Sequence, residues 1–232
     1  MTLWTELARA QTASGDTILL RRRGTIFEIT FNGLQLMSNL NHQSEDILAL
    51  KAARLCHRPP ARVLVAGLGM GFTLRAVLEA TPEPTQITVC EIVPEIAGWC
   101  RGPLAALAGD PLADPRVRLV LADVGQVLQR DAVGFDLILM DTDNGPEALA
   151  REGNAALYGD GGIAAVLAAL RPGGIAAFWS AERSDAFGER LTRAGADWRC
   201  EEVALIPGRV DALHHIYFVG PDTRAAAMRL AA

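Results

Sequence analysis

Several features that would assign the sequence to a particular class of protein are missing from its 232 residues. It has no run of 18 consecutive apolar residues, so we expect no membrane-spanning helix. The N-terminal segment carries two acids and an arginine, rather than the basic and then apolar layout of a secretion signal. The formal net charge is −5, which argues against a protein that binds nucleic acid through positive charge alone. We therefore expect a cytoplasmic protein with neither a membrane nor a nucleic-acid partner.

Motifs of several common enzyme classes are missing as well. The sequence contains neither the G-x-S-x-G of a nucleophile elbow nor the G-K-[ST] of a phosphate loop. His214 and His215 are neighbours on an expected strand and should point to opposite faces, which favours packing or surface roles over a chelating pair. The cysteines show no C-x-x-C pair and no regular spacing, so we expect free thiols and no metal site. The cysteines are Cys56, Cys90, Cys100 and Cys200.

The residues that are present indicate a globular protein whose N-terminal part is a small β-structure. Half of the residues are hydrophobic and 21% are charged, as in folded domains. Residues 17–38 combine β-branched and aromatic residues with turn signals at Arg23-Gly24 and Asn32-Gly33. Asn-Gly between apolar runs is a strong hairpin signal. This segment therefore predicts a β-meander.

The rest of the chain alternates between strand-like and helix-like segments. Residues 42–57 predict a helix with Ser44 as its N-cap. From Arg62 onward the expected strands are 62–67, 86–91, 117–122, 135–141 and 174–180. The expected helices between and after them are 71–80, 94–108, 124–130, 161–170 and 184–194. This alternation predicts a parallel sheet covered by helices on both faces. We expect residues 1–41 to form an N-terminal module and residues 42–232 to form the main domain.

Two further strands are expected at the C-terminal end, at 198–207 and 213–220. A short glycine-containing segment joins them, and no helix lies between. Strands joined without a crossover must pair antiparallel. The sequence therefore predicts a mostly parallel sheet that ends in an antiparallel hairpin.

A glycine-rich loop follows the first strand of this sheet. Gly67, Gly69 and Gly71 form G-x-G-x-G, and position 72 is phenylalanine. The dinucleotide fingerprint G-x-G-x-x-G places its third glycine one residue later, which argues against a nicotinamide cofactor. The alternative is a tight turn between strand and helix that holds no ligand.

Acidic residues follow the next two strands. Glu91 ends one strand at the carboxyl edge, where open α/β sheets bind ligands, and it could accept hydrogen bonds from both hydroxyls of a ribose. It could otherwise be a solvated charge. Asp123 could cap the following helix or accept a bond from an adenine amino group. We expect Ile92 and Val124, the residues after these acids, to line the same site. A glycine loop with these two acids suits an adenosine without a pyrophosphate, and S-adenosylmethionine is the commonest cofactor of that kind.

Two more acids, Asp141 and Asp143, follow the fourth strand. Beside a sulfonium they could hold a cationic amine, and one of them could accept its proton during attack. The alternative is a polar loop in which Asp143 and Asn144 make turn hydrogen bonds. Asp141 and Asp143 are therefore the candidate catalytic residues, and Asp141 is also expected to contact the cofactor.

These motifs together resemble the spermidine synthase family, the polyamine aminopropyltransferases, over residues 17–220. "RVLVAGLGMGFTLRAVLE" is similar to the family's glycine motif, "VCEIVPEI" to its ribose-binding strand, "LADVGQVL" to its adenine-contacting segment and "FDLILMDTDNGP" to its catalytic strand. The resemblance implies a Rossmann-like class I methyltransferase fold. It also implies that Glu91 binds ribose, Asp123 binds the adenine amine, and Asp141 is the general base. A homodimer that pairs through N-terminal strand edges is a further implication.

The sequence departs from the family pattern at three positions. Met70 stands where the family carries an aspartate that holds the amino group of decarboxylated S-adenosylmethionine. The family's Tyr-His/Gln-Glu triplet reads Gln43-Ser44-Glu45 here. In the loop after the fourth strand the second aspartate, Asp143, comes one place early and no proline follows it directly.

Three hypotheses follow from the matches and the departures. The first is methyl transfer from S-adenosylmethionine to a small amine or another small acceptor, because the acid that holds the aminopropyl group is missing. The second is a divergent aminopropyltransferase that uses decarboxylated S-adenosylmethionine, with Glu45 and Asp143 replacing the lost contacts. The third is a non-catalytic nucleoside-binding or oligomerisation module, since a fold does not determine a function.

Overall fold

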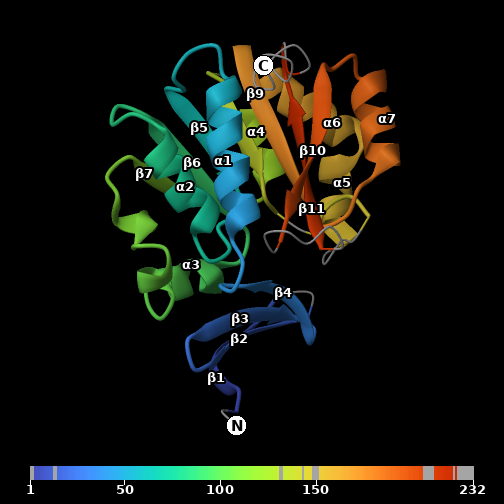
Figure 1. Cartoon of the computed structure of the whole chain (residues 1–232). Coiled ribbons are helices and arrows are strands. Elements are labelled where there is room, and N and C mark those ends of the chain that lie inside the picture. The colour runs from blue at the N-terminus through green and yellow to red at the C-terminus, as the bar shows by residue number, and fades with distance from the viewer. Residues whose placement is uncertain are drawn as a thin grey trace.

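The chain forms a small antiparallel sheet and a larger three-layer α/β domain (Figure 1). The computed structural model describes residues 3–12, 15–130, 133–142, 144–147, 152–205, 212–221 and 223. The strands of the small sheet, in spatial and chain order, are β1 (Thr5–Gln11), β2 (Thr17–Arg23), β3 (Ile26–Phe31) and β4 (Leu34–Ser38). All neighbours in it pair antiparallel, which confirms the predicted meander.

The Asn32-Gly33 turn of the meander lies where the sequence places it, and the first turn lies one residue later than expected, at Gly24 and Thr25. Asn32 and Gly33 connect β3 to β4 with φ of 50° and 83°. Two successive residues with positive φ are typical of the type I′ turn, whose twist matches that of a hairpin. No pattern in the sequence indicated β1. Only Ala10 of this strand is buried, so the strand lacks the inward-facing apolar alternation by which strands are recognised.

The large sheet has the order β10-β11-β9-β8-β5-β6-β7. Its strands are β5 (Arg62–Ala66), β6 (Gln86–Glu91), β7 (Val117–Leu121), β8 (Phe135–Met140), β9 (Leu170–Ser180), β10 (Trp198–Ala204) and β11 (Leu213–Val219). The strands from β5 to β9 pair in parallel, whereas β11 is antiparallel to both β9 and β10. The expected parallel sheet with a C-terminal antiparallel hairpin is therefore confirmed.

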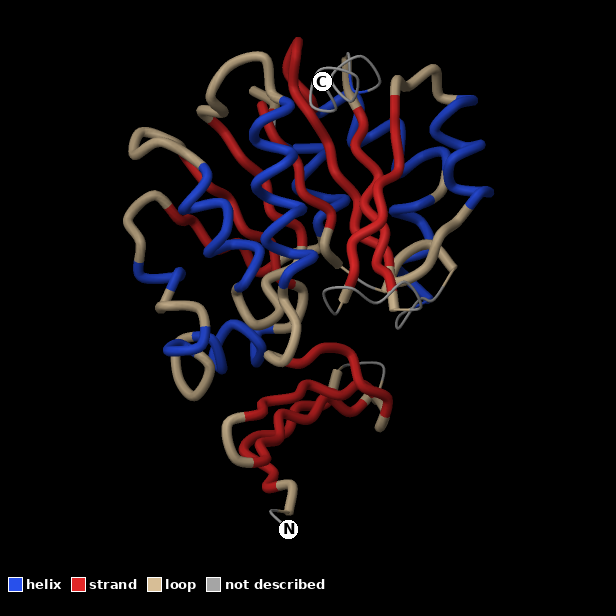
Figure 2. Tube along the Cα trace, in the orientation of Figure 1, coloured by secondary structure: helices blue, strands red, loops and turns tan. Residues whose placement is uncertain are grey.

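Helices cover both faces of the large sheet (Figures 1 and 2). They are α1 (Gln43–Leu55), α2 (Phe72–Ala80), α3 (Pro94–Cys100), α4 (Val124–Arg130), α5 (Ala155–Tyr158), α6 (Asp160–Ala169) and α7 (Asp185–Arg193). Side chains alternate along each strand, so Val63 and Val65 of β5 pack with α1 to α3. Leu64 and Ala66 of the same strand pack with α4 to α7. The near-continuous apolar sequence of the central strands thus reflects burial on both faces.

Three local expectations were wrong. The helix expected over 94–108 ends at Cys100, and a 3₁₀ turn over Ala105–Leu107 follows it. Pro103 lies between the two, and its ring and missing N–H do not allow an α-helix to continue through it. Ser44 is not an N-cap, because α1 begins at Gln43 and the Ser44 hydroxyl bonds to other side chains. The strand β9 begins earlier than expected, at Leu170.

The two sheets share one hydrophobic core. Ile18, Ile29 and Phe31 of the small sheet belong to the same buried cluster as Leu48 of α1 and Val65 of β5. The division of the chain after residue 41 stays a prediction. No described helix is long and apolar enough to cross a bilayer.

Candidate functional site

A cavity of about 660 Å³ lies at the carboxyl ends of the parallel strands. Its floor comes from the residues that follow β5, β6, β7, β8 and β9, which meet at one edge because these strands run in the same direction. Residues Gln35 to Ser38 of β4 also line it, so the small sheet forms part of its wall. The cavity is therefore enclosed between the small sheet and the large domain.

The glycine loop after β5 is shaped by contacts with the rest of the chain. Gly67 has φ of 91°, and a Cβ at this position would collide with the main-chain carbonyl of Asp141 at the end of β8. Gly69 has φ of 53°, and a Cβ there would lie 3.1 Å from the sulfur of Met37 in β4. Side-chain-bearing residues rarely adopt such φ values. Gly71, with φ of 87°, precedes α2. The loop is thus a tight turn packed against β8 and β4, and Gly67 and Gly69 line the cavity.

Glu91 is buried and joins the glycine loop to the end of β6. Its Oε2 accepts a hydrogen bond from the Leu68 N–H at 3.2 Å, and its Oε1 accepts one from the Val93 N–H at 2.8 Å. Burial raises the pKa of Glu91, while the N–H groups of Val93 and Leu68 act in the opposite direction. The alternative of a solvated surface charge is wrong, because only 7% of Glu91 is exposed. Both Glu91 and Ile92 line the cavity.

Asp123 has the capping role that the sequence allowed. Its Oδ1 accepts a hydrogen bond from the Gly125 N–H at 2.7 Å, in the first turn of α4. Asp123 and Val124 line the cavity next to Glu91. Contact between Asp123 and an adenine stays a prediction, as does contact between Glu91 and a ribose.

Asp141 lies at the opposite side of the glycine loop, directly after β8. Its Oδ2 accepts a hydrogen bond from the Thr73 hydroxyl at 2.5 Å, and Thr73 belongs to the first turn of α2. Burial, together with the negative charge of Glu45, raises the pKa of Asp141 to about 7. A carboxylate with such a pKa can accept a proton near neutral pH, which a general base must do.

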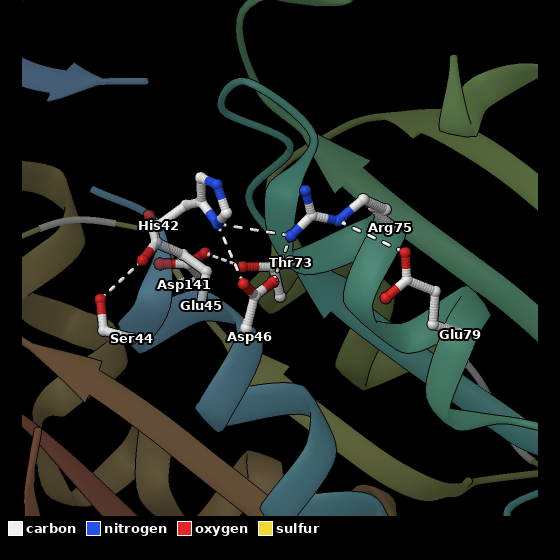
Figure 3. A network of polar contacts seen from close by, with 8 residues as sticks. All are labelled: His42, Ser44, Glu45, Asp46, Thr73, Arg75, Glu79 and Asp141. Atoms are coloured by element: carbon white, nitrogen blue, oxygen red, sulfur yellow. Dashed lines mark hydrogen bonds and ion pairs between the residues drawn. The ribbon is translucent and has the colours of Figure 1, made fainter. Parts of the chain in front are cut away.

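Glu45 reaches the cavity from the first turn of α1 (Figure 3). Its carboxylate accepts a hydrogen bond from the Ser44 hydroxyl at 2.6 Å, and burial raises its pKa. The start of α1 is attached to α2 by an ion pair between Asp46 and Arg75. On the same side the ring of His42 stacks on that of Phe72 at 4.4 Å. These contacts hold Glu45 on the same side of the cavity as Asp141.

The side chains with a formal charge that line the cavity are all acidic. Its acidic lining residues are Glu45, Glu91, Asp123, Asp141 and Glu182. Among the described lining residues there is no lysine or arginine. The one histidine among them is His214, whose pKa is lowered to about 4 by burial, so it is neutral at pH 7. Such a cavity favours cationic ligands over anionic ones.

Residues that the sequence patterns did not identify as site candidates complete the wall. Thr73 and His214 line the cavity beside Trp179, and the Trp179 ring packs edge-on against that of His214 at 4.5 Å. Met70 is buried and lines the cavity as well. The candidate catalytic residue Asp143 lies outside the described residues. The described part of the chain holds no group of acids, histidines or cysteines that could bind a metal ion, and all four cysteines are free.

Known proteins resemble both the sequence and the structure. Polyamine aminopropyltransferase 2 from Pseudomonas aeruginosa is 28% identical over 187 residues, which are 79% of this chain and 48% of that protein. Putrescine N-methyltransferase 3 from Nicotiana tabacum is 34% identical over 117 residues, which are 50% of this chain and 29% of that protein. The matched part of this chain thus spans about half the length of the aminopropyltransferase and less than a third of the length of the methyltransferase.

The solved structure of a spermidine synthase in complex with the transition-state analogue AdoDATO has a TM-score of 0.77 at 18% identity. It covers 92% of this chain, and this chain covers 73% of it. A spermidine synthase from Thermotoga maritima gives a TM-score of 0.73 over 92% of this chain and 72% of the other, also at 18% identity. The shared fold includes the small N-terminal sheet. The model of the spermine/spermidine synthase domain matches residues 44–183, which is more than half of the chain. The chain therefore belongs to the spermine/spermidine synthase family.

Proposed function

We propose that the protein is an aminopropyltransferase that moves the aminopropyl group of decarboxylated S-adenosylmethionine to a small amine. The charge of the cavity is the observation that supports this function. Five carboxyl groups and no cationic side chain line it among the described residues. A decarboxylated donor carries a sulfonium and an ammonium group and no carboxylate, so it fits such a surface. Intact S-adenosylmethionine would bring an α-carboxylate for which the described lining offers no basic partner.

The proposed donor fits the two halves of the cavity. Gly67, Gly69 and Glu91, with Ile92, would hold its ribose side, and Asp123 with Val124 would contact the adenine. When bound, the donor supplies an electrophilic carbon whose bond to sulfur breaks as the amine nitrogen attacks, and the electron pair stays on sulfur.

Asp141 would act as the base in this reaction, and its position beside Thr73 and Glu45 and its raised pKa support this role. The raised pKa allows its carboxylate to accept the proton that the amine nitrogen releases as the new bond forms. The Thr73 hydroxyl holds Oδ2 of this carboxylate in place. Glu45 and Asp141 would together attract an ammonium group into the cavity, because the two carboxylates repel each other when no cation is present. The protein would otherwise contribute mainly by holding the two reactants in line.

Methyl transfer from intact S-adenosylmethionine is the second candidate. The sequence alone ranked it first, because Met70 cannot hold an ammonium ion as a carboxylate does. Resemblance to the putrescine N-methyltransferases of Nicotiana tabacum supports it. The comparisons as a whole support aminopropyl transfer better, since the family model is that of the spermine/spermidine synthase domain, and the match to Polyamine aminopropyltransferase 2 covers 79% of this chain against 50% for the methyltransferase.

Binding and product analysis distinguish these candidates. The purified protein is titrated by calorimetry with S-adenosylmethionine and, separately, with its decarboxylated form. It is then incubated with each donor and 1,4-diaminobutane, and the products are identified by mass spectrometry. We expect tighter binding of the decarboxylated donor and formation of methylthioadenosine. Formation of S-adenosylhomocysteine would instead establish methyl transfer. Binding without turnover over a panel of amines would favour the non-catalytic nucleoside-binding module.

We also propose that the protein is a cytoplasmic homodimer whose protomers meet through the small sheet. Leu3 and Leu34 support this interface, because they lie beside or in its strands and are 81% and 77% exposed. Size-exclusion chromatography with light scattering measures the molar mass directly. The variant Leu34→Glu is expected to shift a dimer toward monomer, and a monomeric wild-type protein would contradict the proposal.

A further inference from the structure

A chain of hydrogen bonds enters the cavity from the last strand of the sheet. Nδ1 of His214 in β11 lies 2.9 Å from the hydroxyl oxygen of Ser44 in α1. The same hydroxyl donates to Oε2 of Glu45 at 2.6 Å. His214 and Glu45 both line the cavity. The sequence predicted a packing or surface role for both histidines of this strand. His215 points to the other face, 4.0 Å from Glu202, whereas His214 belongs to the site.

The number of protons in this chain determines the direction of its bonds. Ser44 has a single hydroxyl proton, which it donates to Glu45 when that carboxylate is ionised. Ser44 then accepts from His214, so the imidazole carries its proton on Nδ1. Its Nε2 is left as an acceptor, and no described residue bonds to that nitrogen. When Glu45 is protonated, each bond reverses. Glu45 donates to Ser44, Ser44 donates to Nδ1, and the imidazole carries its proton on Nε2.

The surroundings keep His214 neutral and hold its ring in place. Burial is the main cause that lowers its pKa to about 4, with a smaller contribution from His215. Trp179 packs against the ring at an interplanar angle of 74°. A proton that enters this chain is therefore better held on Glu45, whose pKa burial raises, than on the imidazole.

We propose that His214, Ser44 and Glu45 form a proton relay that converts the acceptor ammonium to the neutral nucleophile. This inference rests on the proposed amine transfer. The ammonium gives one proton to Nε2 of His214, the Nδ1 proton passes to Ser44, and the Ser44 proton passes to Glu45. The sum is one proton moved from the amine to Glu45, with the imidazole changed from one neutral tautomer to the other. Asp141 remains free for the second proton, which the nitrogen releases as the new bond forms.

Other charged groups surround the relay and enter any pH dependence. Glu45 faces Asp141 after β8, and on its own helix it faces His42 and Asp46. The remaining charged groups on α1 and on the elements packed against α1 and β11 are Arg75 and Glu79 of α2, Asp136 of β8, Arg171 of β9, Glu182 after β9, Arg199, Glu201 and Glu202 of β10, and Lys51 and Arg54 of α1. Most of these are paired with one another. Asp141, His42 and Asp46 are the groups whose charges act most directly on Glu45.

Nitrogen NMR of protein labelled with ¹⁵N-histidine tests the relay without any turnover. The chain has four histidines, and the variant His214→Gln identifies the signals of His214. In the wild type at pH 9 we expect a neutral His214 with a protonated Nδ1 and an unprotonated Nε2. Lowering the pH through the titration of Glu45 should move the proton to Nε2 without forming imidazolium. A His214 that keeps Nε2 protonated at every pH, or that becomes imidazolium near pH 6.5, would overturn the relay.

The variant Ser44→Ala removes the connecting hydroxyl and leaves both ends of the relay in place. In this variant the tautomer of His214 should no longer change with pH, whereas His215→Gln, on the opposite face of the same strand, should leave the change intact. Retention of the change in Ser44→Ala would also overturn the relay. If Ser44→Ala did not fold, its amide spectrum would show this. Ser44→Thr keeps a hydroxyl at this position, and its His214 tautomer should change with pH as in the wild type.

Kinetics separate a proton relay from a merely structural contact. With decarboxylated S-adenosylmethionine and 1,4-diaminobutane as substrates, Ser44→Ala should lower kcat/KM at least 10-fold at pH 7. The loss should shrink at pH 10, where more of the amine enters the site already neutral. A loss that is independent of pH would mean that Ser44 acts only in packing. If the wild type turns over neither donor, the proposed function fails, and the NMR result still decides whether the hydrogen-bond chain exists.

Discussion

The hydroxyl of Thr73 donates to the carboxylate of Asp141 at 2.5 Å, and so joins the first turn of α2 to the end of β8 across the floor of the cavity. This bond stabilises the ionised carboxylate and lowers the pKa of Asp141, against the larger effects of burial and of Glu45. Thr73→Val should therefore raise that pKa further. We expect the rising limb of the pH–kcat profile to move upward by about half a unit to one unit. Thr73→Ser, which restores the hydroxyl, should return the limb to its wild-type position. An unshifted limb in Thr73→Val would mean that Asp141 does not control the rate.

The raised pKa of Asp141 has a consequence for stability. Its pKa is about 7 in the folded chain against an ordinary value of 3.8, so the folded state binds this proton more tightly than the unfolded state does. The contribution of this proton to the free energy of unfolding is fully present below about pH 4 and is lost as the pH rises through 7. An asparagine side chain at this position would have no proton to lose. Asp141→Asn is therefore expected to raise the Tm at pH 8 by roughly 3–8 °C and to give a smaller gain toward pH 4.

Asp136, at the other end of β8, provides the control for this prediction. It accepts hydrogen bonds from the N–H groups of Ala61 and Arg62 and pairs with Arg171. Asp136→Asn should lower the Tm at pH 8, because it removes a charge that is well paired. Differential scanning calorimetry from pH 4 to pH 9 measures both variants. A Tm of Asp141→Asn at pH 8 at or below that of the wild type would contradict the assigned cause.

Gly69 is the position where the glycine loop meets the small sheet. A Cβ there would lie 3.1 Å from the Met37 sulfur, in a backbone conformation with φ of 53°. Gly69→Ala should therefore lower the free energy of unfolding by about 1–2 kcal/mol from the backbone alone, and by more if Met37 cannot move. Urea denaturation measures this. In the double variant Gly69→Ala with Met37→Ala, the part of this loss in unfolding free energy that comes from the clash with Met37 should disappear. The part that comes from the backbone conformation should remain. Gly161→Ala, in α6 with open space around it, should be neutral or slightly stabilising.

Glu91 should contribute to nucleoside binding through the loop that it holds. Both of its oxygens accept backbone N–H groups, from Leu68 and from Val93. Glu91→Gln replaces one acceptor oxygen by an amide NH₂ group that faces an N–H donor. The lost hydrogen bond should destabilise the loop conformation by about 1–3 kcal/mol. We expect the affinity for methylthioadenosine, measured by calorimetry, to fall by about 10-fold or more. Glu95→Gln, an exposed acid at the start of α3, is the matched control and should bind normally.

Much of the fold, and several of the residues that line the cavity, could be predicted from local patterns. Glu91 and Asp141 were identified because each lies at the end of a strand or directly after one, and the carboxyl ends of parallel strands meet at one edge of the sheet. The Asn32-Gly33 turn was identified because only certain residues accept two successive positive φ angles. Each of these signals depends on a few consecutive residues. The edge strand β1 had no such signal, since only one of its residues is buried.

The sequence by itself determined where the loops and acids of the site occur along the chain, because strand alternation, turns and strand ends are properties of neighbouring residues. Only the tertiary structure decided which of those groups face one another. Ser44 and His214 are 170 positions apart, and nothing in either local sequence indicates that α1 packs against β11. The contact of Thr73 with Asp141 likewise depends on how α2 lies over the sheet. Burial by that packing changes the pKa of Asp141 and of His214, and the proton chemistry of the cavity follows from it.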